Sequence, residues 1–439
     1  MAGGKGTRIS SIASDIPKPM IRIGDKPVLE HQIEVLKNQG VTEFIITVSH
    51  LGQVVMDYFG DGSKISPVTG KPFGVKIRYF NEETPLGNAG ALFYLADDLS
   101  DDFLLLNGDL MFDIDLSRFL AFHREHGGIV TLFAHPNSHP YDSGLLVTEK
   151  DGEVTRWLSK EEKRPEYFEN LVNAGIHLVS PKIFPLVSVK HTEYAGGPKI
   201  DLDRDLIRPL VTEHKVYAYR SPEYVRDMGT PDRYEEVSND WKEGIIAGKN
   251  LARKQRAIFL DRDGTINKYV GFLTSLGQME LLPGVTDAIN EIHKNGYLAI
   301  VITNQPVIAR GDVTWDELQQ IHNKMEMLLS KDGAYIDDIF ICPHHPDRGF
   351  EGEIPELKVT CNCRKPKPGL LYQAAEKYNI DLKNSWMIGD SPSDAKAGLA
   401  AGCTGIQLGE CTLQETVYSI FLEETKIWRG LAKAIQNMV

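Results

Sequence analysis

Residues Phe259 to Thr265 read FLDRDGT, and this stretch decides the fold of the C-terminal half. The apolar run 257–260 predicts a buried strand, and two carboxylates, Asp261 and Asp263, follow it. Their two-residue spacing at a strand end can place both side chains around one site. One carboxylate can attack phosphorus while the other protonates the leaving oxygen. Taken alone, the pair could equally be a solvated acidic turn.

Three further motifs follow, each at the end of a predicted strand or in a loop. They supply a hydroxyl, amides, cations and more carboxylates, which suit a phosphoryl group and Mg²⁺. The side chains are Thr303, Asn304 and Gln305 in VITNQ (301–305), Arg364 and Lys365 in RKPKPG (364–369), and Asp390 and Asp394 in MIGDSPSD (387–394). Apolar runs at 298–303, 339–342 and 386–389 alternate with helical stretches such as 315–329. This alternation predicts an α/β domain with its site at the strand ends.

The ordered motifs resemble the haloacid-dehalogenase (HAD) superfamily of phosphohydrolases. The resemblance implies that Asp261 is the nucleophile, forming an aspartyl-phosphate, and that Asp263 is the general acid and later the base. It implies that Lys365 and Thr303 hold the phosphoryl oxygens. Mg²⁺ would be held by Asp261, Asp390 and the backbone carbonyl of Asp263. We expect the substrate-binding residues to be Asn304, Gln305 and Arg364.

Two pairs of potential metal ligands lie between these motifs. They are Cys342 with His344, and Cys361 with Cys363. Three thiols and one imidazole can form a closed tetrahedral Zn²⁺ site, which we expect to be structural. His345 is an alternative to His344 as a ligand. A transient disulfide between the two later cysteines, or unrelated loop cysteines, are the alternatives to zinc.

The two pairs of expected zinc ligands point to particular groups within this superfamily. CPHHP (342–346), CNCRKP (361–366), DRDGT (261–265) and TNQ (303–305) resemble the D-glycero-D-manno-heptose 1,7-bisphosphate 7-phosphatase group. The histidinol-phosphate phosphatase group shares much of this pattern. The chain departs from the family at Pro306-Val307, where Ser-Gly is common, and at Ser391, where Lys is common. These departures bear on the preferred substrate and anomer.

A second set of motifs fills the N-terminal half. GGKGTR (3–8) is a glycine-rich loop whose backbone N–H groups can bind phosphates. PKPM (17–20), LGNAGA (86–91), LLLNGD (104–109), NAG (173–175) and RDMGTP (226–231) follow it. Asp109 and Asp227 are far apart in the sequence, yet such acids can converge on Mg²⁺ at a nucleoside triphosphate. The apolar runs 44–49 and 103–106 predict buried strands of a second parallel sheet.

This set resembles the sugar-1-phosphate nucleotidylyltransferase family. The resemblance implies that Asp109 and Asp227 hold Mg²⁺ and that Lys18 contacts phosphoryl oxygens. The remaining implied contacts are Gly3, Gly4, Gly6, Thr7 and Arg8 with the triphosphate, Glu83 and Gly87 with the base, and Asn173 and Lys160 with the sugar phosphate. Sugar phosphate would attack the α-phosphorus in line, without a covalent intermediate, so positioning and charge neutralisation do most of the work.

One strand of that family has no counterpart in this sequence. A hydrophobic strand precedes the glycine loop in the family, whereas here the loop follows Met1 directly. A parallel sheet without it would expose unpaired backbone groups. We therefore expect the natural chain to be longer, with Met1 internal to the strand or a misassigned start. A complete chain would have a poorly stable or inactive first domain.

The alternation of strands and helices predicts two Rossmann-like α/β domains. The resemblances imply that the first is a GT-A-like nucleotidyltransferase domain (1–241) and the second a HAD-like domain with a zinc-bound loop (257–412). A linker (242–256), alternatively the last helix of the first domain, and a C-terminal helix (413–439) complete the chain. The 439 residues carry a net charge of −13, a poor match for nucleic acid or anionic membranes. Five cysteines and no apolar run of 18 residues favour a cytoplasmic enzyme. An oligomer is compatible with the sequence.

The two halves make chemical sense together. A phosphatase acting on heptose 1,7-bisphosphate at C7 would leave the heptose 1-phosphate that a guanylyltransferase activates with GTP. The sequence thus predicts a bifunctional enzyme that makes GDP-heptose and needs Mg²⁺ at both sites. The alternatives are a mannose or hexose-1-phosphate transferase fused to another sugar-phosphate or histidinol-phosphate phosphatase, and a non-catalytic nucleotide-binding first domain.

Overall fold

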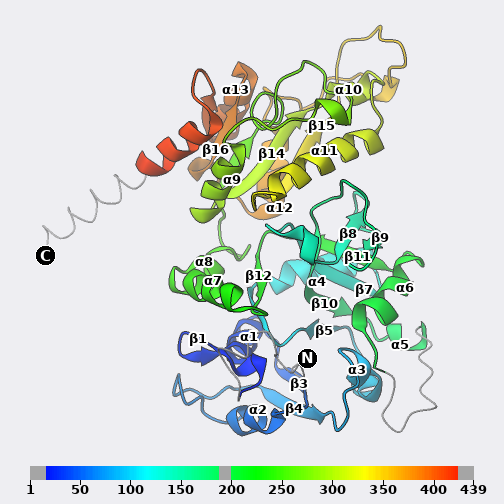
Figure 1. Cartoon of the computed structure of the whole chain (residues 1–439), viewed down its shortest axis with the longest axis vertical. Helices are drawn as coiled ribbons and strands as arrows, with labels where there is room; N and C mark the ends of the chain where they lie inside the picture. Colours follow the sequence, from blue (N-terminus) through cyan, green and yellow to red (C-terminus); the bar gives the residue numbers. More distant parts are fainter. Residues whose placement is uncertain (1–15, 187–198, 424–439) are drawn as a thin grey trace, which may run out of the picture. The chain divides into compact units, whose positions relative to one another are not determined.

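The computed structural model describes residues 16–186 and 199–423 (Figure 1). The described residues form two compact units. The first comprises those of 1–135, 146–158 and 173–252, and the second those of 136–145, 159–172 and 253–439. The boundary at Ala252 falls inside the segment 242–256. The strand expected upstream of residue 3 lies outside the described residues.

A six-stranded sheet forms the centre of the first unit. Its order is β11-β7-β10-β8-β9, and β5 pairs with β10 as well. The strands are β5 (Phe103–Leu106), β7 (Val130–His135), β8 (Leu145–Thr148), β9 (Val154–Leu158), β10 (Val172–Val179) and β11 (Val216–Arg220). Phe119 of the helix α4 (Leu116–His126) packs edge-on against Phe133 of β7. This packing buries one face of the sheet.

Three two-stranded sheets complete the strands of this unit. They are β1 (Arg22–Ile23) with β2 (Lys26–Pro27), β3 (Glu43–Val48) with β4 (Lys76–Asn81), and β6 (Leu110–Asp113) with β12 (Tyr224–Asp227). The pair β3–β4 is parallel, as the sequence predicts for 44–49, and the pair β6–β12 is antiparallel. The run 103–106 forms the strand β5, but β5 pairs antiparallel with β10, so its predicted place in a parallel sheet is wrong.

The helices between these strands are mostly short. They are η1 (Lys18–Met20), α1 (Val28–Lys37), α2 (Gly52–Phe59), α3 (Gly90–Tyr94), η2 (Ala96–Asp98), η3 (Pro140–Asp142), α5 (Ile183–Leu186), η4 (Leu202–Ile207), α6 (Arg208–Val211), α7 (Pro231–Lys242) and α8 (Ile245–Gly248). Gly244, at φ +75°, separates α7 from α8. Ile246 of α8 is buried in a cluster with Met228 and Val237. The segment 242–252 therefore packs with the first unit.

The second unit is built on a five-stranded parallel sheet of order β15-β14-β13-β16-β17. The strands are β13 (Ala257–Leu260), β14 (Leu298–Asn304), β15 (Asp338–Cys342), β16 (Trp386–Gly389) and β17 (Thr404–Gln407). Because β13 lies between β14 and β16, the residues after these three strands meet at one edge. The expected α/β architecture is confirmed in both units.

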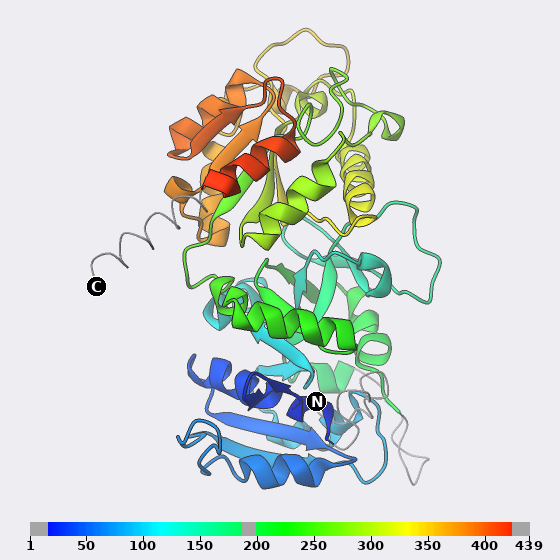
Figure 2. The same ribbon diagram turned by 60° about the vertical axis from the view of Figure 1, so that its left-hand side comes forward.

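Helices cover this sheet. They are η5 (Leu276–Gln278), α9 (Val285–Lys294), α10 (Pro306–Ala309), α11 (Trp315–Ser330), η6 (Pro355–Leu357), α12 (Gly369–Tyr378), η7 (Leu382–Asn384) and α13 (Pro392–Ala401). Residues 413–423 are helical and lie across this sheet (Figure 2). Leu413 and Val417 belong to the same buried cluster as residues of α9 and α11.

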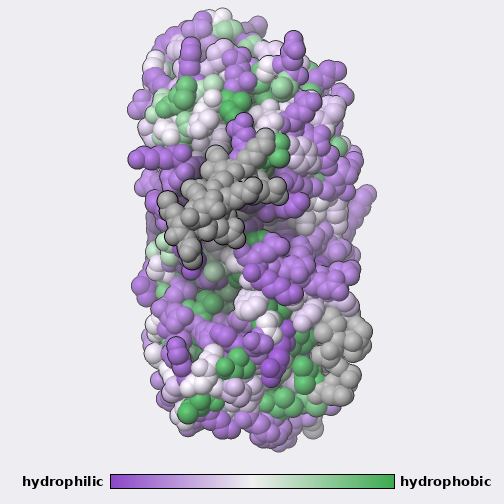
Figure 3. All heavy atoms as spheres, turned by 90° about the vertical axis from the view of Figure 1, so that its left-hand side faces the viewer, coloured by the Kyte–Doolittle hydropathy of each residue, from purple (hydrophilic) through white to green (hydrophobic). Residues whose placement is uncertain are grey.

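No helix among the described residues is long and apolar enough to cross a membrane. The face shown in Figure 3 is mostly hydrophilic, with hydrophobic residues scattered in small groups. Such scattered groups are ordinary on protein surfaces.

Candidate active sites

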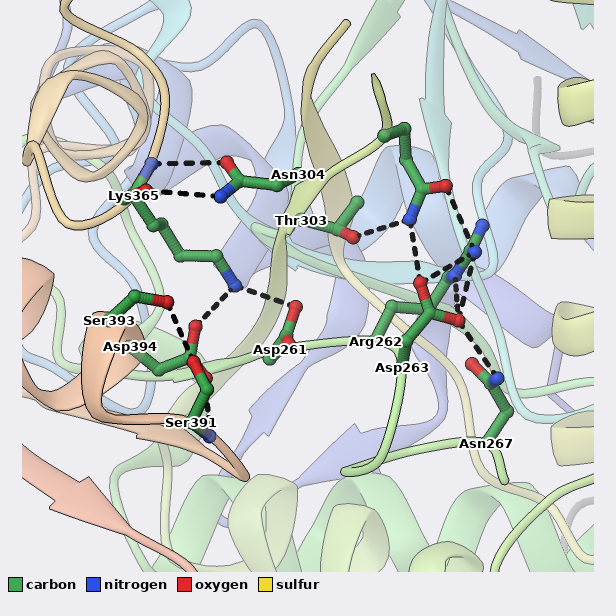
Figure 4. A network of polar contacts seen from close by, with 11 residues as sticks. Asp261, Arg262, Asp263, Asn267, Thr303, Asn304, Lys365, Ser391, Ser393 and Asp394 are labelled. Atoms are coloured by element: carbon green, nitrogen blue, oxygen red, sulfur yellow. Dashed lines mark hydrogen bonds and ion pairs between the residues drawn. The ribbon is translucent and has the colours of Figure 1, made fainter. Parts of the chain in front are cut away.

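Three carboxylates meet at the edge of the second sheet. Asp261 follows β13, Asp390 follows the adjacent strand β16, and Asp394 lies in the first turn of α13. One oxygen from each lies within 4.8 Å of the others. The Lys365 ammonium is 2.6 Å from Asp261 Oδ1 and 2.7 Å from Asp394 Oδ1 (Figure 4).

Charge and burial make this cluster a fit for a divalent cation. The pKa of Asp261 is raised to about 6, mainly because the side chain is buried. The charge of Lys365 opposes this shift, and the charge of Asp394 adds to it. Burial also raises the pKa of Asp390, and Asp394 adds to this shift. Three carboxylates with one ammonium leave an excess of negative charge, and oxygen ligands are those Mg²⁺ prefers. The donor set therefore fits Mg²⁺.

Asn304 fixes the backbone of Lys365. Its Oδ1 accepts the Lys365 N–H at 3.0 Å, and its Nδ2 donates to the Lys365 carbonyl at 3.2 Å. Both ends of the Asn304 amide are thus used within the protein. These hydrogen bonds hold the Lys365 backbone, and the predicted contact of Asn304 with substrate stays a prediction.

Asp263 faces other partners. Arg262 Nη2 donates to its Oδ2 at 2.7 Å, Gln305 Nε2 donates to the same oxygen at 2.9 Å, and Asn267 Nδ2 donates to Oδ1 at 3.0 Å (Figure 4). Burial raises the pKa of Asp263, but the Arg262 charge and these hydrogen bonds lower it below its ordinary value. The side chain is outside the carboxylate cluster, so a metal contact would fall to its backbone carbonyl.

Gln305 links Asp263 to Thr303. Its Nε2 donates to Thr303 Oγ1 at 2.8 Å as well as to the carboxylate, and its Oε1 accepts from Arg262 at 3.0 Å. Gln305 is also buried. In this arrangement Gln305 organises neighbouring side chains, and its predicted contact with substrate stays a prediction.

The four expected zinc ligands lie together. The Sγ atoms of Cys342, Cys361 and Cys363 are 3.1 to 3.6 Å apart, and His344 Nδ1 is 3.3 Å from Cys363 Sγ. These cysteines are free thiols. His345 Nδ1 instead accepts the Asp347 N–H at 3.2 Å. Three thiols and one imidazole with this spacing fit a tetrahedral Zn²⁺ site.

The cysteine loop also holds Arg364. Its Nη1 donates to the His344 carbonyl at 3.2 Å. Arg364 follows Cys363 directly and precedes Lys365, so the cluster lies two residues from the Lys365 ammonium-bearing side chain in the sequence. A metal at the cluster would therefore restrain the backbone that carries both cations.

In the first unit, Asp109 and Asp227 lie at one end of the pair β6–β12. Asp227 pairs with Leu110, and the Met228 N–H donates to the Asp109 carbonyl at 3.1 Å. Lys18 Nζ is 3.0 Å from Asp109 Oδ2. Arg233 Nη1 donates to both Asp227 oxygens, at 3.0 and 2.8 Å. Two adjacent acids, each beside a cation, offer the oxygen donors that Mg²⁺ prefers.

The remaining residues that were predicted to contact the nucleotide or the sugar phosphate have other surroundings. Asn173 Oδ1 accepts the Gly175 N–H at 3.1 Å and lies 3.0 Å from His177 Nε2. Gly87, at φ +85°, approaches Ile200 so closely that a Cβ would overlap its backbone. Glu83 is exposed, and so is Lys160, which lies in the segment 159–172 of the second unit. Gly3, Gly4, Gly6, Thr7 and Arg8 lie outside the described residues.

Comparison with known proteins agrees with this geometry. Residues 1–244 match the family model described as nucleotidyl transferase, and residues 362–410 match the one described as HAD-hydrolase-like. The first match covers more than half of the 439 residues, so the chain belongs to the nucleotidyl transferase family.

A particular phosphatase matches the other half. The D-glycero-beta-D-manno-heptose-1,7-bisphosphate 7-phosphatase of Yersinia pestis is 42% identical over 145 residues, which are 33% of this chain and 75% of that protein. The C-terminal half therefore belongs to this phosphatase family. The chain thus joins a nucleotidyltransferase to a HAD-type phosphatase, as the sequence predicts.

Two further proteins are similar to one half each. A probable mannose-1-phosphate guanylyltransferase 1 from Oryza sativa subsp. japonica is 30% identical over 240 residues, covering 53% of this chain and 61% of that protein. The crystal structure of D,D-heptose 1.7-bisphosphate phosphatase from B. bronchiseptica, complexed with magnesium and phosphate, is 32% identical. It covers 38% of this chain and 99% of its own, with a TM-score of 0.34.

Sequence reasoning missed some polar partners. Arg262 stands inside the DRDGT motif, yet its motif position does not show that it binds Asp263. Arg233 has no motif of its own and meets Asp227 from α7. His322 lies within the helical stretch 315–329, where only its polarity at a buried position could have indicated a role.

Proposed function

We propose that the chain is a bifunctional enzyme of GDP-heptose synthesis. It removes the 7-phosphate of D-glycero-D-manno-heptose 1,7-bisphosphate and transfers GMP from GTP to the resulting heptose 1-phosphate, releasing pyrophosphate. The observation that carries this proposal is the phosphatase cluster of Asp261, Lys365 and Asp394 in a chain that also belongs to the nucleotidyl transferase family. The product of the first reaction is the substrate of the second.

The phosphatase reaction proceeds in two steps. An Asp261 oxygen attacks phosphorus, the P–O bond to the sugar breaks, and Asp263 delivers a proton to the leaving oxygen. Water then attacks the phosphorus of the aspartyl-phosphate while Asp263 takes its proton, and the P–O bond to Asp261 breaks, which releases inorganic phosphate and restores the Asp261 carboxylate. The lowered pKa of Asp263 suits this second step, because the ionised carboxylate is the base. Lys365 neutralises charge on the transferring group.

Two metals complete this half of the proposal. Asp261, Asp390 and the Asp263 carbonyl would hold Mg²⁺, which supplies charge neutralisation at the phosphoryl group. Cys342, His344, Cys361 and Cys363 would hold a structural Zn²⁺. Support for the zinc comes from the spacing of these atoms, and a reducing compartment such as the cytoplasm would preserve the thiols.

The transferase reaction needs no covalent intermediate. The sugar phosphate oxygen attacks the α-phosphorus of GTP, and the bond to pyrophosphate breaks. Asp109 and Asp227 would hold Mg²⁺, which would shield the phosphate charges. Lys18 would then leave its ion pair with Asp109 and contact a phosphoryl oxygen instead. The similarity to a guanylyltransferase supports GTP as the nucleotide.

A second candidate follows from the same relative. A mannose-1-phosphate guanylyltransferase is 30% identical to this chain, so a hexose 1-phosphate is the competing acceptor. In that case the phosphatase would act on an unrelated sugar phosphate. The competing acceptor predicts GDP-mannose from mannose 1-phosphate and no GDP-heptose.

The test is a product assay by mass spectrometry. The chain receives Mg²⁺, heptose 1,7-bisphosphate and equal amounts of GTP, ATP, CTP and UTP, with mannose 1-phosphate in a parallel reaction. GDP-heptose with phosphate and pyrophosphate is the expected result. Asp109→Asn should leave heptose 1-phosphate to accumulate, and Asp261→Asn should leave the bisphosphate intact. A wild-type chain that leaves the bisphosphate intact would overturn the heptose assignment.

A further inference from the structure

Arg262 is a fully buried arginine beside the phosphatase nucleophile. Its Nη2 donates to Asp263 Oδ2 at 2.7 Å and to Gln305 Oε1 at 3.0 Å. Its Nη1 lies 3.1 Å from His322 Nε2. A buried guanidinium is costly unless its N–H groups find acceptors, so these contacts are required for its placement.

His322 is the acceptor from the helix α11. Its side chain is buried, and burial together with the positive charge of Arg262 lowers its pKa to about 3. The ring is therefore neutral at ordinary pH. Since Arg262 can only donate, Nε2 must offer its lone pair and the ring proton must reside on Nδ1.

This contact restrains the general acid. The Arg262 guanidinium binds Asp263 through Nε and Nη2. These contacts join the two side chains to each other but do not by themselves fix the joined pair relative to the rest of the site. His322 restrains the guanidinium at Nη1, while Gln305 restrains it at Nη2. Proton delivery requires the acid within hydrogen-bond reach of the leaving oxygen, so a small displacement of Asp263 slows it.

We propose that His322 is a positioning residue for phosphatase catalysis, acting through Arg262 to hold Asp263 where it protonates the leaving oxygen. This inference rests on the proposed phosphatase chemistry. According to this proposal, the helix α11 not only packs on the sheet but also helps to position Asp263 through His322.

Leaving-group dependence separates positioning from mere structural support. An alkoxide leaving group needs a proton as its bond to phosphorus breaks, whereas 4-nitrophenolate leaves without one. Misplacing Asp263 should therefore slow hydrolysis of a sugar phosphate much more than that of 4-nitrophenyl phosphate. A partly unfolded protein would lose both activities by the same factor.

The experiment compares His322→Leu and His322→Gln in the full chain. For His322→Leu we expect kcat/KM on heptose 1,7-bisphosphate, which reports the steps up to departure of the leaving group, to fall at least about tenfold more than kcat/KM on 4-nitrophenyl phosphate. His322→Gln, whose Oε1 can accept from Arg262, should restore most of the difference. If the wild type leaves the bisphosphate intact, phenyl phosphate takes its place as the substrate with the poor leaving group. An intact bisphosphate would overturn the proposed substrate and not this inference.

The matched control is His293→Leu. His293 is a histidine of the same unit whose Nε2 lies 3.0 Å from Asp337, a partner outside the Asp263 network. This change should scale both activities equally. In an Asp263→Asn background, His322→Leu should add no further leaving-group dependence. Equal losses on both substrates for His322→Leu, no loss at all, or no rescue by Gln would overturn the proposal.

Discussion

Gly264 lies against the carboxylate of Asp390, so closely that a Cβ on Gly264 would overlap Oδ2 of that side chain. Gly264 also has φ +83°, a conformation that other residues adopt at a cost. The turn after the nucleophile strand and the acid after β16 therefore constrain each other. Their contact sets the position of Asp390, one of the two carboxylates that would hold Mg²⁺.

We expect Gly264→Ala to weaken Mg²⁺ binding more than it weakens folding. The added methyl group must displace the Asp390 carboxylate, so the Mg²⁺ concentration for half-maximal phosphatase activity should rise about tenfold or more. Phosphatase assays across a Mg²⁺ titration measure this. Gly277→Ala is the control, since nothing lies within 4 Å of a Cβ there. An unchanged Mg²⁺ requirement in Gly264→Ala would contradict the role assigned to this contact.

Lys365 contributes a buried positive charge directly beside Asp261. We expect Lys365→Met to lower phosphatase kcat by about 10²- to 10³-fold, because one preorganised cation on the phosphoryl oxygens is lost. Pyrophosphate release by the first unit should stay at the wild-type rate. Lys383→Met, at an exposed lysine of η7, serves as the control. Loss of both activities in Lys365→Met would point to misfolding.

Zinc content tests the cysteine cluster directly. We expect about one zinc per chain in the purified protein by elemental analysis, and its loss in Cys363→Ser. Phosphatase activity should fall with it, because Lys365 lies two residues further along the chain. Cys403→Ser, at a buried thiol outside the cluster, should keep its zinc. Wild-type protein without zinc would refute the structural metal.

Glu223 gives the first unit a pH-dependent stability. Burial raises its pKa to about 7, although it accepts the N–H groups of Asp115 at 2.6 Å and Leu251 at 2.9 Å. The folded state thus binds more protons than the unfolded state between pH 4.5 and about 7. Its contribution to stability is therefore present below pH 4.5 and is lost as the pH rises to 7.

Glu223→Gln removes this dependence. The amide oxygen can still accept both N–H groups, and the variant should gain stability on the wild type as pH rises, approaching about 3 kcal/mol at pH 8. Calorimetric melting at pH 5 and pH 8 measures the difference. A variant whose advantage is the same at both pH values would show that Glu223 does not titrate in this range.

The sheet of the second unit was largely readable from its sequence. The runs 257–260 and 386–389 coincide with β13 and β16, because buried parallel strands are short, apolar and bounded by motif residues. The segment 242–256 was harder to assign. Its charges suggest a solvated connector, but Gly244 turns the chain and Ile246 anchors it to a core formed by residues distant in sequence.

The same limit applies to the sites. The motifs LLLNGD and RDMGTP predict Asp109 and Asp227 as a converging pair, and the structure places the two residues at the same end of the pair β6–β12. The contact of Arg262 with His322 depends on how α11 packs on the sheet. A helical period shows which face is buried, but not which buried side chain meets a particular motif.

The paired hydrogen bonds between Asn304 and Lys365 close the cysteine loop onto the sheet. The loop leaves the sheet at Cys342, the last residue of β15, and is held to the end of β14 again at Lys365. In its middle, the Ile354 N–H donates to the Ala309 carbonyl, and Ile354 and Leu357 pack against Val307 and Ile308. The loop is therefore attached at both ends and in its middle, so a shift of its central residues would be transmitted to α10, which follows Gln305.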